Sequence, residues 1–495
     1  MSLSLTPREA WQPLPAAQWN AAAARHLLRR TGWTARADDV NRAVNEGLSA
    51  TLDRLFPAEP PRLEKPRLVA RYEEAAMGMQ RAMVGTTGDE RLRKQREVQE
   101  RARIAVQELS IKWLQFAARP ESSAIAKWVL FLSDVYVISA EKVRNAGVIF
   151  QHFDLLTQQG LGSAPALTKA VSRSPAMVIY LDLAQSQLKA PNENFARELF
   201  ELFVLGEGNY SESDIKESAR AFTGYRARPE GVFRLETRQQ DLREKTIFGA
   251  SGKFSGDDVI ELAYSQPAAS TFLPRELARF YLTDLALPAA HLSALGDEWR
   301  SSGFELRTLV RQFFASRLFF APEFRGNLIK SPLQFYLGFA QDMQLDIAPL
   351  PRLTLNPLRQ MGQALFYPPN VRGWVGGRQW INSSTLTARR QLVESLFAPL
   401  DENSLNADEQ IELVAARSNG LTRFTVPDEP FNDLARLDPA GAAQKMTRDL
   451  LPDGASAAVR ENLQLFIAAA NDRQRLSRIR RAALTLMQSP EYQLC

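Results

Sequence analysis

Within residues 192–206, four strongly polar side chains interrupt an apolar run that follows Glu193. Wound as an α-helix at about 100° per residue, this segment places on one stripe, roughly 100° wide, the side chains of Asn194, Arg197, Glu198 and Glu201. A helix that is apolar over most of its circumference is normally buried, so the stripe can line an internal polar site. Glu198 and Glu201 are therefore the candidate general acid and base.

The same stripe has a purely structural interpretation. Glu193 and Arg197, and then Arg197 and Glu201, are each four residues apart, which places them as neighbours on one helix face. Buried charges must be paired, and a ladder of these three residues would pair them. We expect the three charges to be linked, with at least two of them mostly buried. The sequence leaves both alternatives open, a structural ladder and a ligand or catalytic site.

The elements that must position this helix are themselves helical. Apolar residues recur with helical spacing from about residue 18 to about residue 488, and no helix is predicted between residues 417 and 456. Residues 231–249 alternate instead, which predicts one small β-hairpin pairing 232–237 with 245–249. The expected fold is all-α, a large multi-helix protein with that hairpin inserted. Residues 1–400 would form the main domain, and residues 401–495 a C-terminal helical segment packed on it.

Composition narrows the possible classes of protein. The chain has 495 residues, 45% hydrophobic and 24% charged, and a net charge of +5, which is weak support for a nucleic-acid partner. Its single cysteine, Cys495, excludes an intramolecular disulfide and a cysteine-based zinc cluster. The most apolar run, residues 128–138, contains Asp134 and is too short to span a bilayer. No export signal is recognised, which predicts the cytoplasm, or the periplasm if an N-terminal signal has been removed.

Motifs for metals, phosphates and nucleophilic catalysis are missing. The three histidines, His26, His152 and His291, have no metal-ligand spacing, and there is no Walker A loop and no Gly-x-Ser-x-Gly elbow. We therefore expect neither a metal nor a cofactor. The available chemistry is acidic, basic and aromatic.

The remaining polar and aromatic candidates are far apart in the sequence. The loop 366–380 is rich in proline, glycine and aromatic residues, and its glycines allow a close backbone approach. We expect this loop and the hairpin to converge on the acidic helix and form one polar pocket, floored by Glu198 and walled by Trp374 or Trp380. In the structural alternative the tryptophans fill the core. The candidate ligand-binding residues are Asn192, Asn194, Arg197, Arg220, Tyr225, Asp241, Lys245, Arg372, Trp374 and Trp380.

The order of short motifs resembles a known bacterial family. The matching segments are residues 26–30 (HLLRR), 174–182 (SPAMVIYLD), 192–198 (NENFARE), 219–225 (ARAFTGY), 245–249 (KTIFG), 330–333 (KSPL), 368–374 (PPNVRGW) and 489–493 (SPEYQ). In this order they are similar to the family called domain of unknown function 1800. The resemblance implies one large helical unit of unknown biochemistry. It also implies a possible partner, since such proteins are often encoded beside domain of unknown function 1501, which looks like the alkaline phosphatase and sulfatase superfamily.

The chain departs from this family at its most reactive positions. Where relatives tend to show Phe-Trp-His-Asn-His-Phe, residues 131–136 read FLSDVY, and where they tend to show His-Asp-x-Gly-x-Lys, residues 240–245 read QDLREK. Three imidazoles are therefore absent, and with them the best candidates for metal ligands or general bases. If the family has a histidine-dependent activity, this chain is expected to lack it.

Three functions compete on this basis. The first is a non-catalytic helical scaffold or partner-binding protein, serving a hydrolase of the alkaline phosphatase type. The second is a hydrolase or transferase that uses a pocket of glutamate, arginine and lysine on an anionic substrate. The third is nucleic-acid binding through the C-terminal arginines, which are Arg473, Arg475, Arg478, Arg480 and Arg481. An enzyme requires the polar stripe to open into a cleft, whereas a structural ladder requires it to be sealed and paired.

Overall fold

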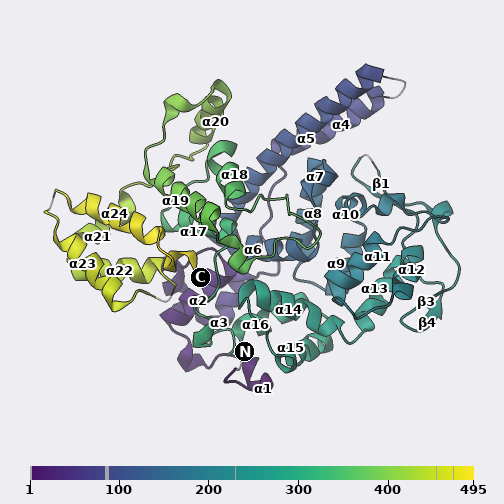
Figure 1. The fold of residues 1–495 in the computed structure, drawn as a ribbon, viewed down its shortest axis with the longest axis horizontal. Coiled ribbons are helices and arrows are strands. Elements are labelled where there is room, and N and C mark those ends of the chain that lie inside the picture. The colour runs from purple at the N-terminus through teal and green to yellow at the C-terminus, as the bar shows by residue number, and fades with distance from the viewer. Residues whose placement is uncertain (1–2, 84–87, 229, 453, 472) are drawn as a thin grey trace.

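The chain folds into an all-α protein, as the periodicity predicts. The computed structural model describes residues 3–83, 88–228, 230–452, 454–471 and 473–495 (Figure 1). Its first half contains the helices α1 Pro7–Ala10, α2 Ala21–Thr31, α3 Ala37–Leu55, α4 Arg67–Met83, α5 Gly88–Ala117, α6 Pro120–Val135, α7 Ala140–Val143, α8 Ala146–Gln159, α9 Ala164–Ser172, α10 Pro175–Tyr180, α11 Asn194–Glu198 and α12 Glu212–Ala221.

The second half continues in the same way. It contains α13 Gly256–Ser265, α14 Ala269–Tyr281, α15 Ala289–Ser301, α16 Leu306–Ala315, α17 Pro332–Asp342, α18 Pro351–Gln360, α19 Ser383–Phe397, α20 Ala407–Ser418, α21 Glu429–Arg436, α22 Pro439–Leu450, α23 Ala457–Ala468 and α24 Arg475–Met487. Among the described residues, no helix is long and apolar enough to cross a membrane.

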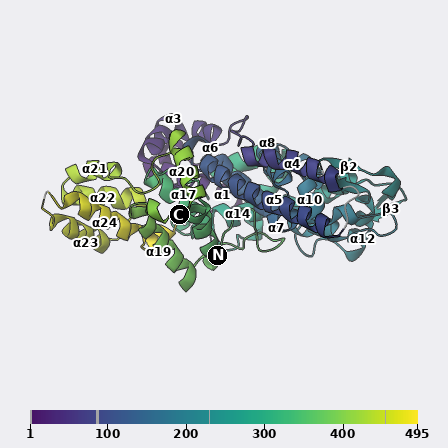
Figure 2. The ribbon, with the colours of Figure 1, turned by 90° about the horizontal axis from the view of Figure 1, so that it is seen from above.

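Helix α6 lies at the centre of the core. It is buried on nearly every side and packs against α2, α3, α5 and α8, which explains its almost uninterrupted apolar sequence. Helices α4 and α5 pack on each other and extend away from the body as an arm (Figure 1). Seen from above, the molecule is elongated, with α21–α24 at one end and the strands at the other (Figure 2).

Two short hairpins replace the single hairpin that the sequence predicts. Strand β1 (Tyr225–Ala227) pairs with β2 (Phe233–Leu235), and β3 (Lys245–Ile247) pairs with β4 (Ala250–Gly252). The predicted pairing of 232–237 with 245–249 was wrong, because each strand pairs with its nearest neighbour along the chain. Phe248 and Gly249 both have positive φ, 50° and 81°, which a two-residue turn of a tight hairpin requires.

The C-terminal quarter contains two helices that the sequence analysis missed, α21 and α22. Helix α22 has a clear local signal, because Asp438 caps it by accepting a hydrogen bond from the amide of Gly441, and Pro439 follows. A small separate core surrounds α20, built from Ala348, Leu350, Leu405, Leu413, Ala416 and Phe424. The buried apolar residues of α21, α22, α23 and α24 belong to the main core. Only the part around α20 therefore has a core of its own.

Buried basic side chains close the ends of several helices. Arg30, which is 1% exposed, donates from its guanidinium to the carbonyl oxygens of Tyr281 at 3.1 Å, Leu282 at 3.4 Å and Phe324 at 2.5 Å, and to the side chain of Asn327. The first two carbonyls end α14, where the backbone leaves acceptors without a helical partner. The negative end of the helix dipole also favours a cation at this position.

Two further buried cations, Arg29 and Lys127, donate to the carbonyl ends of other helices. Arg29 donates to three carbonyl oxygens at the end of α22, those of Arg448 at 3.4 Å, Asp449 at 2.8 Å and Pro452 at 3.1 Å. The ammonium group of Lys127, on α6, donates to the carbonyl oxygens of Gly32 at 2.9 Å and Arg29 at 3.4 Å, at the end of α2. These contacts connect α2, α6, α14 and α22, which lie far apart in the sequence.

We expect Arg30→Met to lower the free energy of unfolding by at least about 3 kcal/mol, because several buried acceptors lose their donor and each costs about 1–3 kcal/mol. Arg436→Met is the matched control, since Arg436 is 81% exposed and, within the described part of the chain, pairs only with Asp433. It should change stability by less than about 1 kcal/mol. Urea denaturation of both variants measures the difference, and equal unfolding midpoints would contradict the prediction.

Candidate functional site

The polar helix is not a regular α-helix along its whole length. Helix α11 ends at Glu198, and residues Leu199–Val204 continue as a π-helical turn with i→i+5 hydrogen bonds. The amides of Leu205 and Gly206 both donate to the carbonyl of Phe200 at 2.9 Å, and Gly206 has a φ of 83°. Such wider turns are rare and are frequently found at functional sites. From Leu199 onward, side chains therefore point in directions that 100° spacing does not give.

This geometry breaks the predicted ladder of charges. Arg197 does pair with Glu193, at 3.4 Å, but its second partner is Glu212, at 2.8 Å and 2.9 Å. Glu201 instead accepts hydrogen bonds from the hydroxyl of Tyr210, at 2.8 Å, and from Arg372, at 2.7 Å. The predicted link from Arg197 to Glu201 was wrong, because the π-helical turn rotates Glu201 away from it. All three side chains of the expected ladder are partly exposed.

Glu201 and Arg372 lie at a cavity of about 590 Å³. The cavity is enclosed by α6, α14, the π-helical turn, the start of α17 and the loop that contains residues 371–380. Its aromatic walls are formed by Trp33, Phe131, Phe272, Phe280, Trp374 and Trp380. The polar stripe thus opens, at its C-terminal end, into a space large enough for a small molecule.

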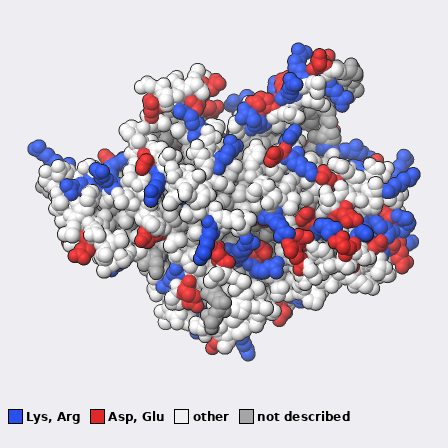
Figure 3. All heavy atoms as spheres, in the orientation of Figure 1, with Lys and Arg blue, Asp and Glu red and all other residues white. Residues whose placement is uncertain are grey.

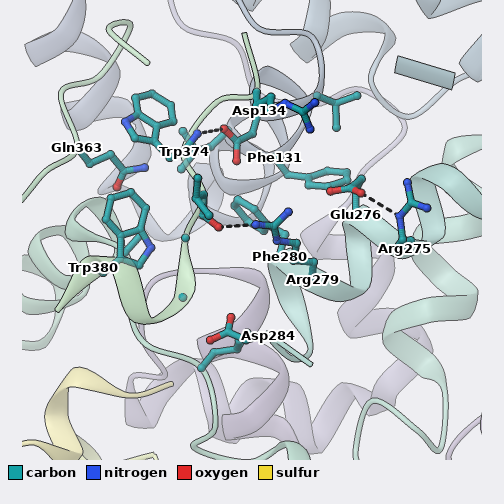
Figure 4. A pocket seen from close by; sticks show the side chains of 18 of the residues that line it. Phe131, Asp134, Arg275, Glu276, Arg279, Phe280, Asp284, Gln363, Trp374 and Trp380 are labelled. Atoms are coloured by element: carbon teal, nitrogen blue, oxygen red, sulfur yellow. Dashed lines mark hydrogen bonds and ion pairs between the residues drawn. The ribbon is translucent and has the colours of Figure 1, made fainter. Parts of the chain in front are cut away.

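The loop is built over two carboxylates. Any side chain at position 373 would collide with the carboxylate of Asp134, and one at position 377 would come within 2.7 Å of the carboxylate of Asp284. Both positions are glycine with positive φ, 70° and 58°. The amide of Trp374 donates to Asp134 Oδ1 at 2.9 Å, and Arg279 donates to the carbonyl of Val375 at 2.9 Å (Figure 4).

Asp134 is the most strongly perturbed acid of the cavity. Burial raises the pKa of its carboxyl to about 7, although the amide of Trp374 and the charge of Arg279 act in the opposite direction. Among the described residues, its second oxygen, Oδ2, has no hydrogen-bond partner. Both protonation states are therefore populated near neutral pH, which is what a general acid–base group requires.

Arg279 is the cation whose charge acts on Asp134. Figure 4 shows Asp134 and Arg279 around one central space, with Phe131 and Phe280 beside them. No described residue forms an ion pair with Arg279, and its only hydrogen bond goes to Val375. Burial raises the pKa of Asp284, against the attraction of Arg279 and Arg378. The cavity therefore combines two perturbed carboxyl groups with a guanidinium that retains free donors.

Lys127 lies two helical turns before Asp134 on α6 and also lines the cavity. Burial lowers the pKa of its ammonium group to about 7. Its ammonium group donates to two carbonyls at the end of α2, and the rings of Trp33 and Tyr281 lie 5.6 Å away. These contacts hold Lys127 in place, so we assign it to the wall of the cavity and not to proton transfer.

The structure brings only some of the predicted residues together. Glu201, Arg372, Trp374 and Trp380 line the cavity, as expected for the loop. Glu198 does not line it, although burial and the charge of Glu201 raise its pKa. In place of Glu198, the acids that line this part of the cavity include Glu201, from the π-helical turn, and Asp134, from α6.

The hairpin does not converge on the cavity, contrary to expectation. Asp241 is fully buried, and hydrogen bonds from Arg243 and Arg220 hold its pKa well below the ordinary value. Lys245 donates to the carbonyls of Asp241, at 2.7 Å, and Arg243, at 3.0 Å. Strand β3 packs on α12, which keeps this cluster in a separate place.

Three further candidates also lie outside the cavity. Tyr225 is buried between the rings of Phe222 and Phe233, so it belongs to the core. Asn192 accepts a hydrogen bond from the amide of Asn194, at 2.9 Å, just before α11. The side chain of Asn194 donates to Asp182 at 3.5 Å.

Sequence reasoning missed Asp134, Arg279 and Asp284 as site residues. A signal existed for Asp134, the only charged residue in the most apolar run of the chain, residues 128–138. A lone acid on a buried helix must be compensated or functional. It also lies in the segment 131–136, where the family resemblance expects histidines, and Phe131, Asp134 and Val135 of this segment line the cavity. No comparable signal marks Arg279 or Asp284.

The raised pKa of Asp134 predicts a pH dependence of stability. Its folded pKa lies above the unfolded value, so the stability that it contributes is present below about pH 4 and is lost as the pH rises to about 7. Asp134→Asn keeps the acceptor for Trp374 and removes the titration. We expect wild type to lose stability relative to this variant by up to about 1.4 kcal/mol per pH unit in this range, and no further above it.

Urea denaturation between pH 4 and pH 9 measures this difference. Ser133→Ala, on the same helix, removes no ionisable group and should shift the free energy of unfolding equally at every pH. A difference between wild type and the Asp134→Asn variant that does not change with pH would show that Asp134 titrates normally.

Among the described residues, no three or more histidine, cysteine, aspartate or glutamate side chains are grouped so that they could hold a metal ion. No curated protein and no solved structure matches the chain. The sequence profile of one family, described as Protein of unknown function (DUF1800), matches residues 26–494. This match covers nearly the whole chain, including every element that encloses the cavity. The protein therefore belongs to the DUF1800 family.

Proposed function

We propose that the cavity binds a small molecule with a planar apolar ring and an anionic group, and that Asp134 exchanges a proton with it. The observation that carries the proposal is one shared space. It contains a carboxyl group with a pKa of about 7, a guanidinium with free donors and aromatic walls. This is the constellation by which a catalytic or binding site is recognised from its geometry.

Each part of the site has a physical role in this proposal. Arg279 would hold the anionic group through the donors that none of the described residues uses. Trp374, Trp380 and Phe280 would pack on the ring and displace water, which strengthens the polar contacts. Asp134 would accept or donate the proton, since it is poised to do so at neutral pH. Such a site suits acid–base catalysis of hydrolysis or group transfer.

A second candidate is partner binding through the arm formed by α4 and α5. The arm extends away from the body (Figure 1). Its apolar side chains Leu92 and Ile104 are 52% and 42% exposed. The partner we propose is a hydrolase of the alkaline phosphatase superfamily. Affinity purification from the native host should recover it with wild type and not with the Leu92→Glu, Ile104→Glu double variant. Equal recovery with both proteins would exclude the arm as the contact.

Nucleic-acid binding has less support. Arg475 donates to the carbonyls of Ala435 and Leu437, Arg478 to that of Phe466, and Arg480 to those of Val426 and Pro427. These three arginines tie α24 to neighbouring segments. On the face seen in Figure 3, basic and acidic side chains are interspersed and form no continuous basic surface.

We expect benzoate, the simplest aromatic carboxylate, to bind with a Kd of about 1 mM, as small fragments do. Arg279→Met should raise this Kd at least tenfold, because the carboxylate loses its cationic partner. Affinity in wild type should also fall as the pH rises through about 7, because ionised Asp134 repels the carboxylate. Saturation-transfer NMR measures both effects.

Arg436→Met, which changes an arginine outside the cavity, should bind benzoate as wild type does. Two results would contradict the proposal. One is the absence of saturation transfer to benzoate, and the other is equal affinity of the wild-type and Arg279→Met proteins.

A further inference from the structure

Two buried glutamines form part of the cavity wall. Gln334, on the first turn of α17, is 5% exposed, and Gln363, in the segment before the loop, is 3% exposed. Both line the cavity. Their segments meet at this wall, because Gln363 Oε1 accepts a hydrogen bond from the amide of Leu333, the residue before Gln334.

The hydrogen bonds fix which amide atom of each glutamine is free. Gln363 Oε1 accepts from the amide of Leu333 at 3.0 Å, so its Nε2 donors are left, and no described residue accepts from them. Gln334 Nε2 donates to the carbonyl of Arg29 at 3.1 Å, so its Oε1 is left, and no described residue donates to it. Buried polar atoms normally have a partner. The wall therefore presents the free amide donors of Gln363 and the free amide acceptor of Gln334 to the cavity.

Aromatic rings flank this polar pair. Figure 4 shows the amide of Gln363 between the indole rings of Trp374 and Trp380. Among the described residues, no acceptor bonds the indole N–H of either tryptophan, and both residues line the cavity. A planar group that enters here can pack on a ring while its edge meets the glutamine amides.

We infer that this wall is a subsite for an aromatic carboxamide. The ligand carbonyl accepts a hydrogen bond from Gln363 Nε2, and the ligand N–H donates to Gln334 Oε1. A carboxylate has no N–H for Gln334, and an amine has no acceptor for Gln363, so each leaves a buried atom without a partner. The inference rests on the proposed function, since it names a chemical group of the ligand that the same cavity would bind.

The test uses benzamide and benzylamine, which carry the same ring with different polar groups. We expect wild type to bind benzamide at least tenfold more tightly than benzylamine in saturation-transfer titrations. Gln363→Glu keeps the acceptor for the amide of Leu333 and replaces the free donor by an oxygen, so it should weaken benzamide binding at least tenfold. The matched control is Gln341→Glu. Gln341, on α17, is buried as Gln363 is, but it donates a hydrogen bond to the carbonyl of Ala118 and does not line the cavity.

A second variant distinguishes loss of the subsite from a folding defect. Gln363→Met is uncharged, so it should lose benzamide while it still binds benzoate through Arg279. Benzamide binding that is unchanged in both Gln363 variants, or a preference of wild type for benzylamine, would overturn the subsite. If benzoate binds in an Arg279-dependent manner and benzamide does not bind, the subsite fails and the proposed function stands. If neither binds, the proposed function fails, and the subsite fails with it.

Discussion

The fold depends on buried cations that satisfy the carbonyl ends of helices. Arg29, Arg30 and Lys127 each reach the C-terminus of a helix that is remote in sequence, and they use backbone oxygens instead of carboxylates as partners. A guanidinium can serve several carbonyls at once, so one residue fixes both the direction and the end of a neighbouring helix. Because Lys127 and Asp134 share α6, the same contacts set the position of the helix from which the cavity is built.

The cavity is assembled by contacts between distant parts of the chain. The loop reaches α6 through Trp374 and Asp134, α14 through Val375 and Arg279, and the π-helical turn through Arg372 and Glu201. Each contact joins a polar group of the loop to a different element. The loop is thus fixed by hydrogen bonds to three different elements. Because it is fixed in this way, the free polar atoms of the cavity keep fixed relative positions.

Structural features that depend on residues close together in the sequence can be predicted from local sequence patterns. The all-α class follows from the helical spacing of the apolar residues. The loop containing Arg372 and Trp374 was identified from its glycines and prolines, and the structure brings it to Glu201. What could not be predicted is non-local or irregular. Nothing in the sequence marks the π-helical turn, and the partners of Asp134 and Arg279 lie about a hundred residues or more away.

The hydrogen bond from the amide of Trp374 to Asp134 couples the protonation state of this carboxyl group to the position of the loop backbone. An amide N–H binds an ionised carboxylate more strongly than a neutral one, so this hydrogen bond favours release of the proton, whereas burial of the carboxyl favours its retention. Thermodynamic reciprocity then requires that uptake of the proton weaken this hydrogen bond by the same free energy. The contact of the loop with the cavity therefore depends on the charge of Asp134, and a change in either one changes the other.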